Sequence, residues 1–398
     1  MQDQRIVVER ILLPSGEMSG PAQITIRGSK IIDVTTPCPA GALDKASLTF
    51  AGCTALPGLI DAHVHLCFDP RTRDVTGACQ SLADGDLLQL MGRFAAGAAA
   101  AGVTTLRDCG DRNFLSVALR SHLEQRPGPT VVCCGPPLTV DGGHCAFLGG
   151  SVPSNVQPAE LVDTWQDKGV DQIKVMVSGG ILTPESSPMD LQFTVTQLKE
   201  LVERAHGVGL PVAAHAHSTA AVTAAVAAGV DTIEHASFQT SDAFSHAVSG
   251  SQVDALAESG IVVSPTLCAR PGVEQSAQRL RWRQELVARL HQAGVRLAAG
   301  TDAGVLQGLG HDSLPYALQT FTDSGLSARE ALLAGTVNAA RAVGKANSKG
   351  ALAPGWDADV LIVKGNPLQD ITALRHIAAV FARGRRLAPL SVSDRAPL

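Results

Sequence analysis

Apolar runs of two different lengths alternate along most of this chain. Between about Gly58 and Gly300, short runs rich in β-branched residues alternate with longer Ala- and Leu-rich stretches of helical period. Eight short runs read as strands: LIDAHVHL, GVTTLRDCG, TVVCCG, DQIKVMV, LPVAAHAH, VDTIEHA, IVVSPTL and VRLAAGTD. The stretches that read as helices include residues 82–100, 158–169, 194–208, 219–228 and 276–293. Eight strand–helix units that close on themselves predict an α/β fold of the (β/α)8 TIM-barrel type.

The two ends of the chain follow a different pattern. Residues 1–55 and 350–388 contain short alternating strands separated by Gly and Pro turns. We expect these ends to pair with each other as a small β-sandwich. The prediction is therefore a composite sandwich domain from residues 1–56 and 348–398, and a barrel domain from residues 57–347.

Composition narrows the class of protein. The chain has 398 residues, of which 45% are hydrophobic and 17% charged, as in a globular enzyme with a large core. A net charge of −5 and a pI near 6.2 give no basic footprint for nucleic acid. The N-terminus lacks the apolar core of a secretory signal, and no run is long enough to span a membrane. Nine cysteines without a Cys-x-x-Cys pair indicate buried thiols, so we expect a cytoplasmic protein.

Polar residues end several of the predicted strands. His63 and His65 lie two apart on the first strand, so both imidazoles project to one side and can hold one metal ion. Such a pair alone is more often a packed or surface pair. Four further metal-competent residues end other apolar runs: Lys174, His215, His235 and Asp302. In a closed barrel all six meet at one end, because active sites lie at the C-terminal ends of the strands.

The order of the strands divides these residues into two groups. His63 and His65 on the first strand neighbour Asp302 on the eighth, which predicts one metal site. His215 and His235 on adjacent strands form the second group, and Lys174 lies beside them. A protonated lysine repels a metal, whereas its neutral amine can take up carbon dioxide to form an anionic carbamate that bridges two ions. A salt bridge to an acid is the ordinary alternative for a buried lysine.

At this point the chain resembles the metal-dependent amidohydrolase superfamily over nearly its whole length. The motifs that carry the resemblance are LPGLIDAHVHL, GVTTLRDCG, IKVMVSGG, VAAHAHS, GVDTIEHAS, GTDAG, TVNAARAVG and PGWDADVLIV. It is most similar to the branch with prolidase-like and arginine-type carboxypeptidases, imidazolonepropionase-like proteins and ochratoxinase. Deaminase-type members usually lack the bridging lysine and have a Glu after the fifth-strand histidine, and neither feature holds here.

The resemblance implies a cofactor and a mechanism. Two divalent ions, usually zinc, would be bridged by carbamylated Lys174 and by a hydroxide. The implied ligands of one ion are His63, His65 and Asp302, and those of the other are His215 and His235. Asp302 would accept the proton of the attacking hydroxide and deliver it to the leaving amine.

Substrate contacts are expected from strand ends and loops. His144 follows Gly142 and Gly143, and relatives with a Gly-Gly-His loop suggest that it polarises the substrate carbonyl. His217 shares the parity of His215 and should face the pore as a substrate contact, although many relatives have Tyr there. Gly179, between Ser178 and Gly180, could offer a backbone donor, with a plain turn as the alternative. Arg270 and His311 follow the last two strands and could meet a carboxylate, although exposed loop positions explain them as well.

Together these observations predict a binuclear metal hydrolase that acts on a small molecule. The expected reaction is cleavage of an amide bond in a dipeptide or N-acyl amino acid with a free carboxylate. Two other enzyme classes stay open: a lactonase or phosphotriesterase, and a hydrolase of a neutral or cyclic amide. A non-catalytic barrel with structural metals is a third alternative. We expect a homo-oligomer, with neither nucleic acid nor membrane as a partner.

Overall fold

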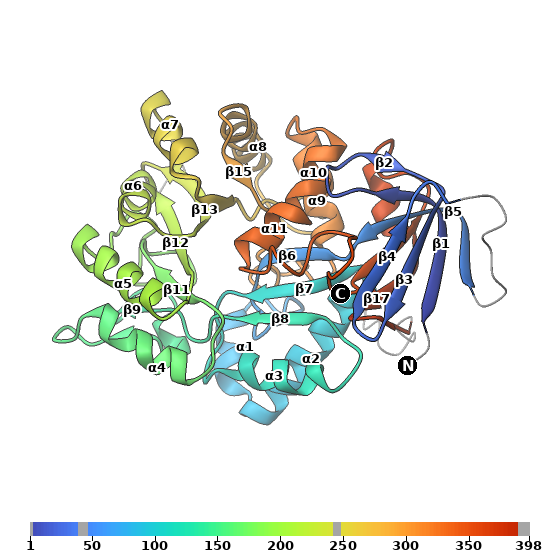
Figure 1. Ribbon diagram of the computed structural model, residues 1–398. Coiled ribbons are helices and arrows are strands. Elements are labelled where there is room, and N and C mark those ends of the chain that lie inside the picture. The colour runs from blue at the N-terminus through green and yellow to red at the C-terminus, as the bar shows by residue number, and fades with distance from the viewer. Residues whose placement is uncertain (1–2, 39–46, 242–247, 389–398) are drawn as a thin grey trace.

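The computed structural model describes residues 3–38, 47–241 and 248–388 (Figure 1). Eight parallel strands follow the predicted order. Three form one sheet: β6 (Leu59–Val64), β7 (Val103–Asp108) and β8 (Thr130–Cys133). Five form another: β11 (Ile173–Met176), β12 (Val212–Ser218), β13 (Thr232–Gln239), β14 (Val262–Ser264) and β15 (Arg296–Leu297). The structure therefore confirms the α/β class.

The two parallel sheets meet at both edges through isolated pairs of residues. Val64, at the end of β6, bridges Ala303 just beyond β15, and Leu138 bridges Val175 on β11. A few backbone hydrogen bonds accompany each bridge, such as Ala62 N–H to the carbonyl of Ala299 and Leu138 N–H to the carbonyl of Lys174. The described strands therefore form two sheets in contact, and their closure into one barrel stays a prediction. Both links place the C-terminal ends of strands from the two sheets side by side.

Helices cover the outside of these strands (Figure 1). They are α2 (Asp84–Ala100), α3 (Leu115–Glu124), α4 (Val162–Asp167), α5 (Val195–Gly207), α6 (Thr219–Ala228), α7 (Gly250–Ser259), α8 (Ala277–Gln292) and α9 (Leu314–Asp323), with the shorter α1 (Val75–Ser81), α10 (Ala328–Ala334) and α11 (Val337–Ala342). Local sequence sets several starts, because the Thr194 hydroxyl caps α5 and Ser276 caps α8. Four of the five predicted helices start within two residues of their predicted positions. The stretch predicted from residue 158 begins as a 3-10 helix, Pro158–Leu161, and becomes α-helical only at Val162.

Both ends of the chain share one mixed sheet. Its order is β18-β17-β16-β5-β1-β3-β4, with β2 paired to β1. The strands are β1 (Gln4–Leu12), β2 (Met18–Ser19), β3 (Ala22–Arg27), β4 (Lys30–Thr35), β5 (Ser47–Pro57), β16 (Val360–Lys364), β17 (Ile377–Ala382) and β18 (Arg385–Arg386). The predicted pairing of the two ends is confirmed by the antiparallel contact of β5 with β16. The two-layer sandwich and the domain boundaries stay predictions.

This terminal sheet leads directly into the first strand of the barrel. β5 ends at Pro57, and the next residue, Gly58, donates its N–H to the carbonyl of Asp359 at 2.9 Å. A Cβ at Gly58 would lie 2.1 Å from Thr104 Oγ1, so no larger residue fits. The strand that carries the predicted His63 and His65 ligands is thus fixed by residues from both ends of the chain.

Two further findings bear on the sequence predictions. All nine cysteines are buried and lie outside any disulfide in the described structure. Among the residues described, none of the helices has the length and apolar character needed to cross a membrane.

Candidate active site

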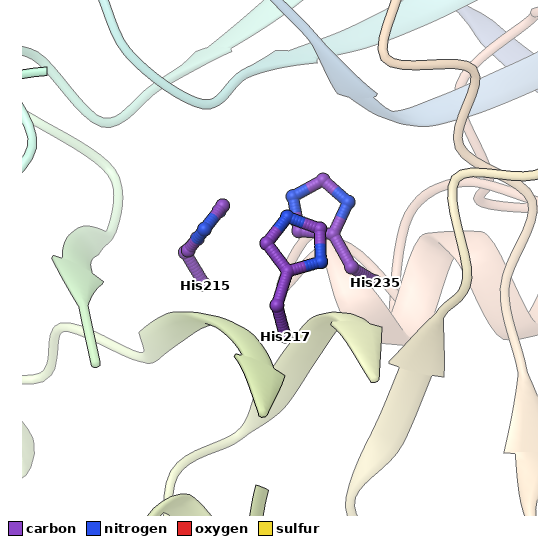
Figure 2. Close-up of side chains that lie close together, drawn as sticks. All are labelled: His215, His217 and His235. Carbon is purple, nitrogen blue, oxygen red and sulfur yellow. The ribbon is translucent and has the colours of Figure 1, made fainter. Parts of the chain in front are cut away.

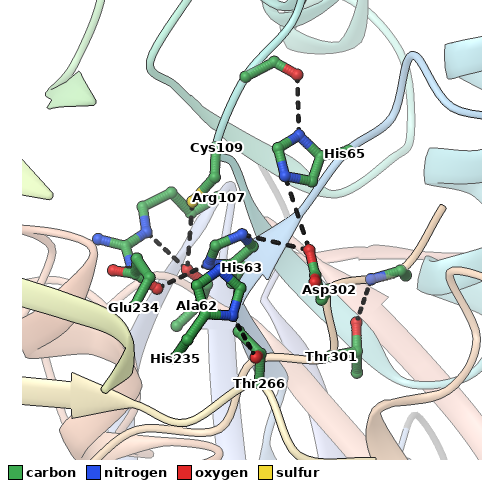
Figure 3. A network of polar contacts seen from close by, with 12 residues as sticks. Ala62, His63, His65, Arg107, Cys109, Glu234, His235, Thr266, Thr301 and Asp302 are labelled. Atoms are coloured by element: carbon green, nitrogen blue, oxygen red, sulfur yellow. Dashed lines mark hydrogen bonds and ion pairs between the residues drawn. The ribbon is translucent and has the colours of Figure 1, made fainter. Parts of the chain in front are cut away.

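The first group of predicted ligands comes together as expected. His63 lies on β6 and His65 just after it, and both are buried. Their Nε2 atoms lie 3.4 Å and 3.6 Å from Oδ1 of Asp302 (Figure 3). Asp302 has a positive φ of 61°, which a non-glycine residue adopts only where its surroundings enforce it. We call His63, His65 and Asp302 the first cluster.

A buried ion pair stands behind His63. Glu234 Oε2 lies 2.7 Å from His63 Nδ1, and its other oxygen accepts a hydrogen bond from Arg107 Nη2 at 2.5 Å (Figure 3). All three side chains are essentially inaccessible to solvent. A carboxylate on the far nitrogen fixes the tautomer of a histidine and leaves Nε2 as the free ligand atom. Glu234 therefore orients His63 toward Asp302.

Arg107 is the largest fully buried side chain in the described structure. Its donors reach the carbonyls of Ala62 and Ala342 and the side chains of Gln172 and Thr232. Burial opposes ionisation of Glu234, but Arg107 and His63 hold the pKa of that carboxyl well below its usual range. Glu234 therefore stays ionised beneath the first cluster, with its charge shared between Arg107 and His63.

The same surroundings act on the first cluster's histidines. Although burial opposes a charge on His63, the neighbouring Cys109 and Glu234 raise its pKa to about 9. Burial lowers the pKa of His65, whose Nδ1 lies 3.0 Å from the carbonyl oxygen of Gly110. Cys109 and Glu234, which favour a proton on His63, also favour a divalent cation beside it, because a proton and a metal cation are both positively charged.

Three histidines form a second cluster. His215 and His217 come from β12 and His235 from β13 (Figure 2). The centres of the His215 and His235 rings lie 4.6 Å apart, and the ring of His217 stacks on His235 at 4.4 Å. One ligand atom from each of the three lies within 4.8 Å of the others. The sequence predicted His215 and His235 as ligands and His217 as a substrate contact, and the structure places a nitrogen of His217 in the same group.

Neutral groups support this second cluster. His217 Nδ1 lies 3.0 Å from Ser237 Oγ, and His235 Nδ1 lies 2.7 Å from Thr266 Oγ1. His215 Nε2 lies 3.2 Å from the carbonyl oxygen of Gly179. Burial, followed by the repulsion of neighbouring positive charges, lowers the pKa of all three imidazoles well below its ordinary value. They are neutral, so their lone pairs are available to a metal.

An irregular strand explains how β13 contributes to both clusters. Regular alternation would send Glu234 and His235 to opposite sides of β13. The backbone instead adopts positive φ values at His235 (68°) and Ala236 (43°), and the pairing with β12 shifts register after Ala216. Both side chains consequently reach the interior, Glu234 under the first cluster and His235 in the second.

Lys174, on β11, is buried completely, and its Nζ has no hydrogen-bond partner among the described residues. Its positive charge acts on His63 in the first cluster and on His235 in the second. An unpaired buried ammonium is costly. The salt bridge that the sequence left open is thus absent from the described structure.

These donors fit a pair of divalent ions. Imidazole nitrogens and a carboxylate are the ligands that zinc and similar ions prefer. Each cluster supplies three such ligands within a space of one ion. The partnerless Lys174 nitrogen, which faces both, is the remaining group that the resemblance would assign to a bridge.

His144 lies over the second cluster. Its ring is buried and centred 4.8 Å from that of His215. A Cβ at Gly180 would lie 2.4 Å from His144 Nε2, so the glycine makes room for the ring. Burial lowers the pKa of His144 to about 3, and its Nδ1 has no partner in the described chain. His144 is therefore a neutral imidazole beside the candidate metal ligands.

Three predictions about substrate contacts are corrected. The amide of Gly179 donates to the carbonyl of Asp190, so it is no donor for a ligand. Arg270 pairs with Asp312 and donates to Ser313 at 2.8 Å, away from the site. His311 is buried and not exposed, and its Nε2 lies 3.0 Å from the carbonyl oxygen of His65. The actual partners of Gly179, Arg270 and His311 depend on backbone hydrogen bonding, ion pairing and burial, which the sequence does not reveal.

A cavity of about 950 Å³ opens over both clusters. Its lining includes every predicted metal ligand, together with His144 and His217. It also includes Arg279 and Arg283 of α8, which the sequence analysis did not single out. Their spacing of four residues puts them on one face of a helix, but no sequence signal says that this face lines the site.

Comparisons with known proteins agree with this geometry. Residues 54–387 match the model of the amidohydrolase family. The chain is 31% identical over 227 residues to an ochratoxinase from Aspergillus niger, covering 54% of this chain and 45% of that protein. It is 25% identical over 413 residues to an imidazolonepropionase from Rubrobacter xylanophilus, covering 94% and 92%. The matched region thus spans about half the length of the ochratoxinase.

Solved structures share the fold. A Xaa-Pro dipeptidase with bound methionine in its active site superposes with a TM-score of 0.83 at 23% identity, over 97% of this chain and 100% of the other. Phenylurea hydrolase B gives 0.83 at 20% identity, over 99% of both chains. The ochratoxinase structure gives 0.80 at 23% identity, over 97% and 95%. Because the family model matches most of its length, the chain belongs to the amidohydrolase family.

Proposed function

We propose that this protein is a binuclear metal hydrolase that cleaves the amide bond of a small substrate with a free carboxylate. The observation that carries the proposal is Lys174, whose buried nitrogen lacks a partner in the described chain and acts on both clusters. As a carbamate it would bridge one ion held by the first cluster and another held by the second. Two ions bound there would supply an acidic water and polarise the scissile carbonyl.

Asp302 is the proposed proton carrier. Its side chain is 22% exposed, whereas that of His63 is 1% exposed, so within the first cluster Asp302 is the group that substrate can reach. Asp302 takes a proton from the attacking water and gives it to the leaving nitrogen as the C–N bond breaks. His144, a neutral imidazole on the cavity wall, donates a hydrogen bond to the carbonyl oxygen.

The test combines metal analysis with a substrate screen. The purified protein, loaded with excess zinc, should contain two ions per chain by elemental analysis. It should hydrolyse N-acyl amino acids or dipeptides faster than lactones or phosphotriesters. A reproducible content of one ion per chain would contradict the bridged pair, and turnover of lactones alone would replace the amidase with the lactonase alternative.

A further inference from the structure

Two guanidinium groups share one wall of the cavity. Arg279 and Arg283 lie one turn apart on α8, and both belong to the lining. Two residues spaced by four positions present their side chains side by side on a helix. The α8 wall of the cavity therefore carries a concentrated positive charge.

Arg283 is fixed in place by the strand end beside the second cluster. Its Nη2 donates to the carbonyl of Pro265, to the carbonyl of Thr266 at 3.0 Å and to the hydroxyl of Thr266 at 3.1 Å. The same hydroxyl lies 2.7 Å from Nδ1 of His235. These hydrogen bonds hold α8 against the segment that follows β14. Arg279 lies one helical turn closer to the start of α8.

Both arginines act on the interior of the cavity. Burial is the main cause of the lowered pKa of His217, and the charges of Arg283 and Arg279 contribute to it. The charge of Asp302 in turn acts on Arg279 and Arg283. The two guanidinium groups thus act on the charges of His217 and Asp302 from the cavity wall that a bound substrate would meet.

The remaining lining is poor in negative charge and rich in apolar side chains. Its only carboxylates among the described residues are Glu274 and Asp302, and Asp302 belongs to the first cluster. Ile181 and Leu306, at the rim, are 53% and 39% exposed. With Asp302 in the first cluster, Glu274 is the one carboxylate of the described lining left for an ammonium, and it shares the lining with Arg279 and Arg283. The positive α8 wall therefore favours an N-acyl amino acid, which carries a carboxylate and an uncharged acyl group, over a free dipeptide, which carries an ammonium.

We infer that Arg279 binds the carboxylate of the substrate and that the preferred substrates are N-acyl amino acids with apolar acyl groups. The inference rests on the proposed function and names its substrate class. Arg283 positions this wall, because its Nη2 is engaged by Pro265 and Thr266. Arg279 makes the contact, and an arginine can bind a carboxylate through two parallel hydrogen bonds.

The experiment compares N-octanoyl-leucine, its methyl ester and the dipeptide alanyl-leucine on the zinc-loaded enzyme. Wild type should prefer the N-acyl acid over the other two. Arg279→Met should lower kcat/KM for the acid by about 10- to 100-fold, the range of a charge-assisted contact, with little change for the ester. Arg279→Lys should lie in between. The matched control is Arg281→Met, an exposed arginine of the same helix outside the cavity lining, which should behave as wild type.

A binding arm separates this inference from the proposed function. Calorimetric titration of the same acid and ester needs no turnover, and the acid should bind at least about tenfold more tightly in wild type but not in Arg279→Met. Equal loss of acid and ester binding, or an unchanged preference in Arg279→Met, would overturn the role of Arg279. Absence of amide hydrolysis with intact acid binding would instead count against the proposed reaction. Faster turnover of alanyl-leucine would refute the N-acyl class.

Discussion

The two histidine clusters are supported by different kinds of partner. Behind His63 in the first cluster stands Glu234, itself paired with the buried Arg107. In the part of the chain that the structure describes, the partners of His217 and His235 in the second cluster are the hydroxyls of Ser237 and Thr266. A carboxylate makes its histidine a more basic ligand than a neutral hydroxyl does. In the proposed binuclear centre, the first cluster should therefore bind its ion more strongly, and the second cluster should depend on a further ligand.

Lys174 is the group that can supply this ligand. A carbamate on its nitrogen would bring a negative charge to the second cluster, which otherwise contains neutral imidazoles alone. The two sites would then become interdependent, because one modified side chain serves both. Substitutions behind each cluster can test this interpretation.

The largest effect is expected from Lys174→Ala, which removes the shared group. Activity should fall to background and the metal content from two ions to one, with the first cluster still filled. Short carboxylic acids added to the assay should restore part of the activity by replacing the missing anion. The control is Lys199→Ala, an exposed lysine of α5. Near-normal turnover in Lys174→Ala would rule out the carbamate.

The next effect concerns the catalytic member of the first cluster. Asp302→Asn keeps the shape of the side chain but cannot carry a proton, so kcat should fall by about 100-fold. Stopped assays at saturating substrate measure kcat, and thermal unfolding shows whether the fold is retained. An unchanged kcat would show that the proton is carried by another group.

Glu234→Gln tests the carboxylate behind the first cluster directly. The amide preserves a hydrogen bond to His63 but removes the charge, and zinc affinity of the tighter site should fall by about 10- to 100-fold. Competition with a chromophoric chelator gives both affinities. Arg107 loses its counter-ion in this variant, so the free energy of unfolding should be measured in parallel. If Glu234→Gln weakens only the lower-affinity site, the first cluster is the weaker of the two sites, contrary to the proposal.

The smallest effect should come from the hydroxyls behind the second cluster. Thr266→Val removes the partner of His235 Nδ1 at similar volume, and Ser237→Ala does the same for His217. Loss of one neutral hydrogen bond corresponds to a decrease of about fivefold in affinity for the weaker ion. The same chelator competition applies. A loss as large as that of Glu234→Gln would remove the distinction between the clusters.

Much of this arrangement could be predicted from sequence because it depends on periodicity. The apolar runs predict the strands that carry Lys174 and the histidines, although Lys174, His215 and His235 lie within these strands and not at their ends. The parallel order of the strands brings these residues together. Glu234 could not be found this way, since strict alternation directs it away from His235. The positive φ values of His235 and Ala236 depart from regular strand geometry, and this irregularity brings both Glu234 and His235 into the interior.

Charged side chains in loops and helices were predicted less well. Arg270 appeared suitable for a carboxylate, but Asp312 binds it. Arg279 and Arg283 lie on a helix whose bounds the sequence predicts closely, yet its orientation toward the cavity depends on packing between distant segments. Ion pairing and tertiary packing therefore limit prediction of the substrate contacts more than of the metal ligands.

The position of β6 between the two ends of the chain has a consequence for biosynthesis. Its neighbours come late: His65 donates its N–H to Ala303 at 3.0 Å, and Ile60 donates to Gly335 at 2.9 Å. Asp302 is synthesised about 240 residues after His63, a delay of roughly 10 to 50 s at ordinary translation rates. During that interval the ribosome-bound chain holds an incomplete first cluster. Loading of the proposed ions would then follow translation, and the metals available to the finished chain would decide which ions it binds.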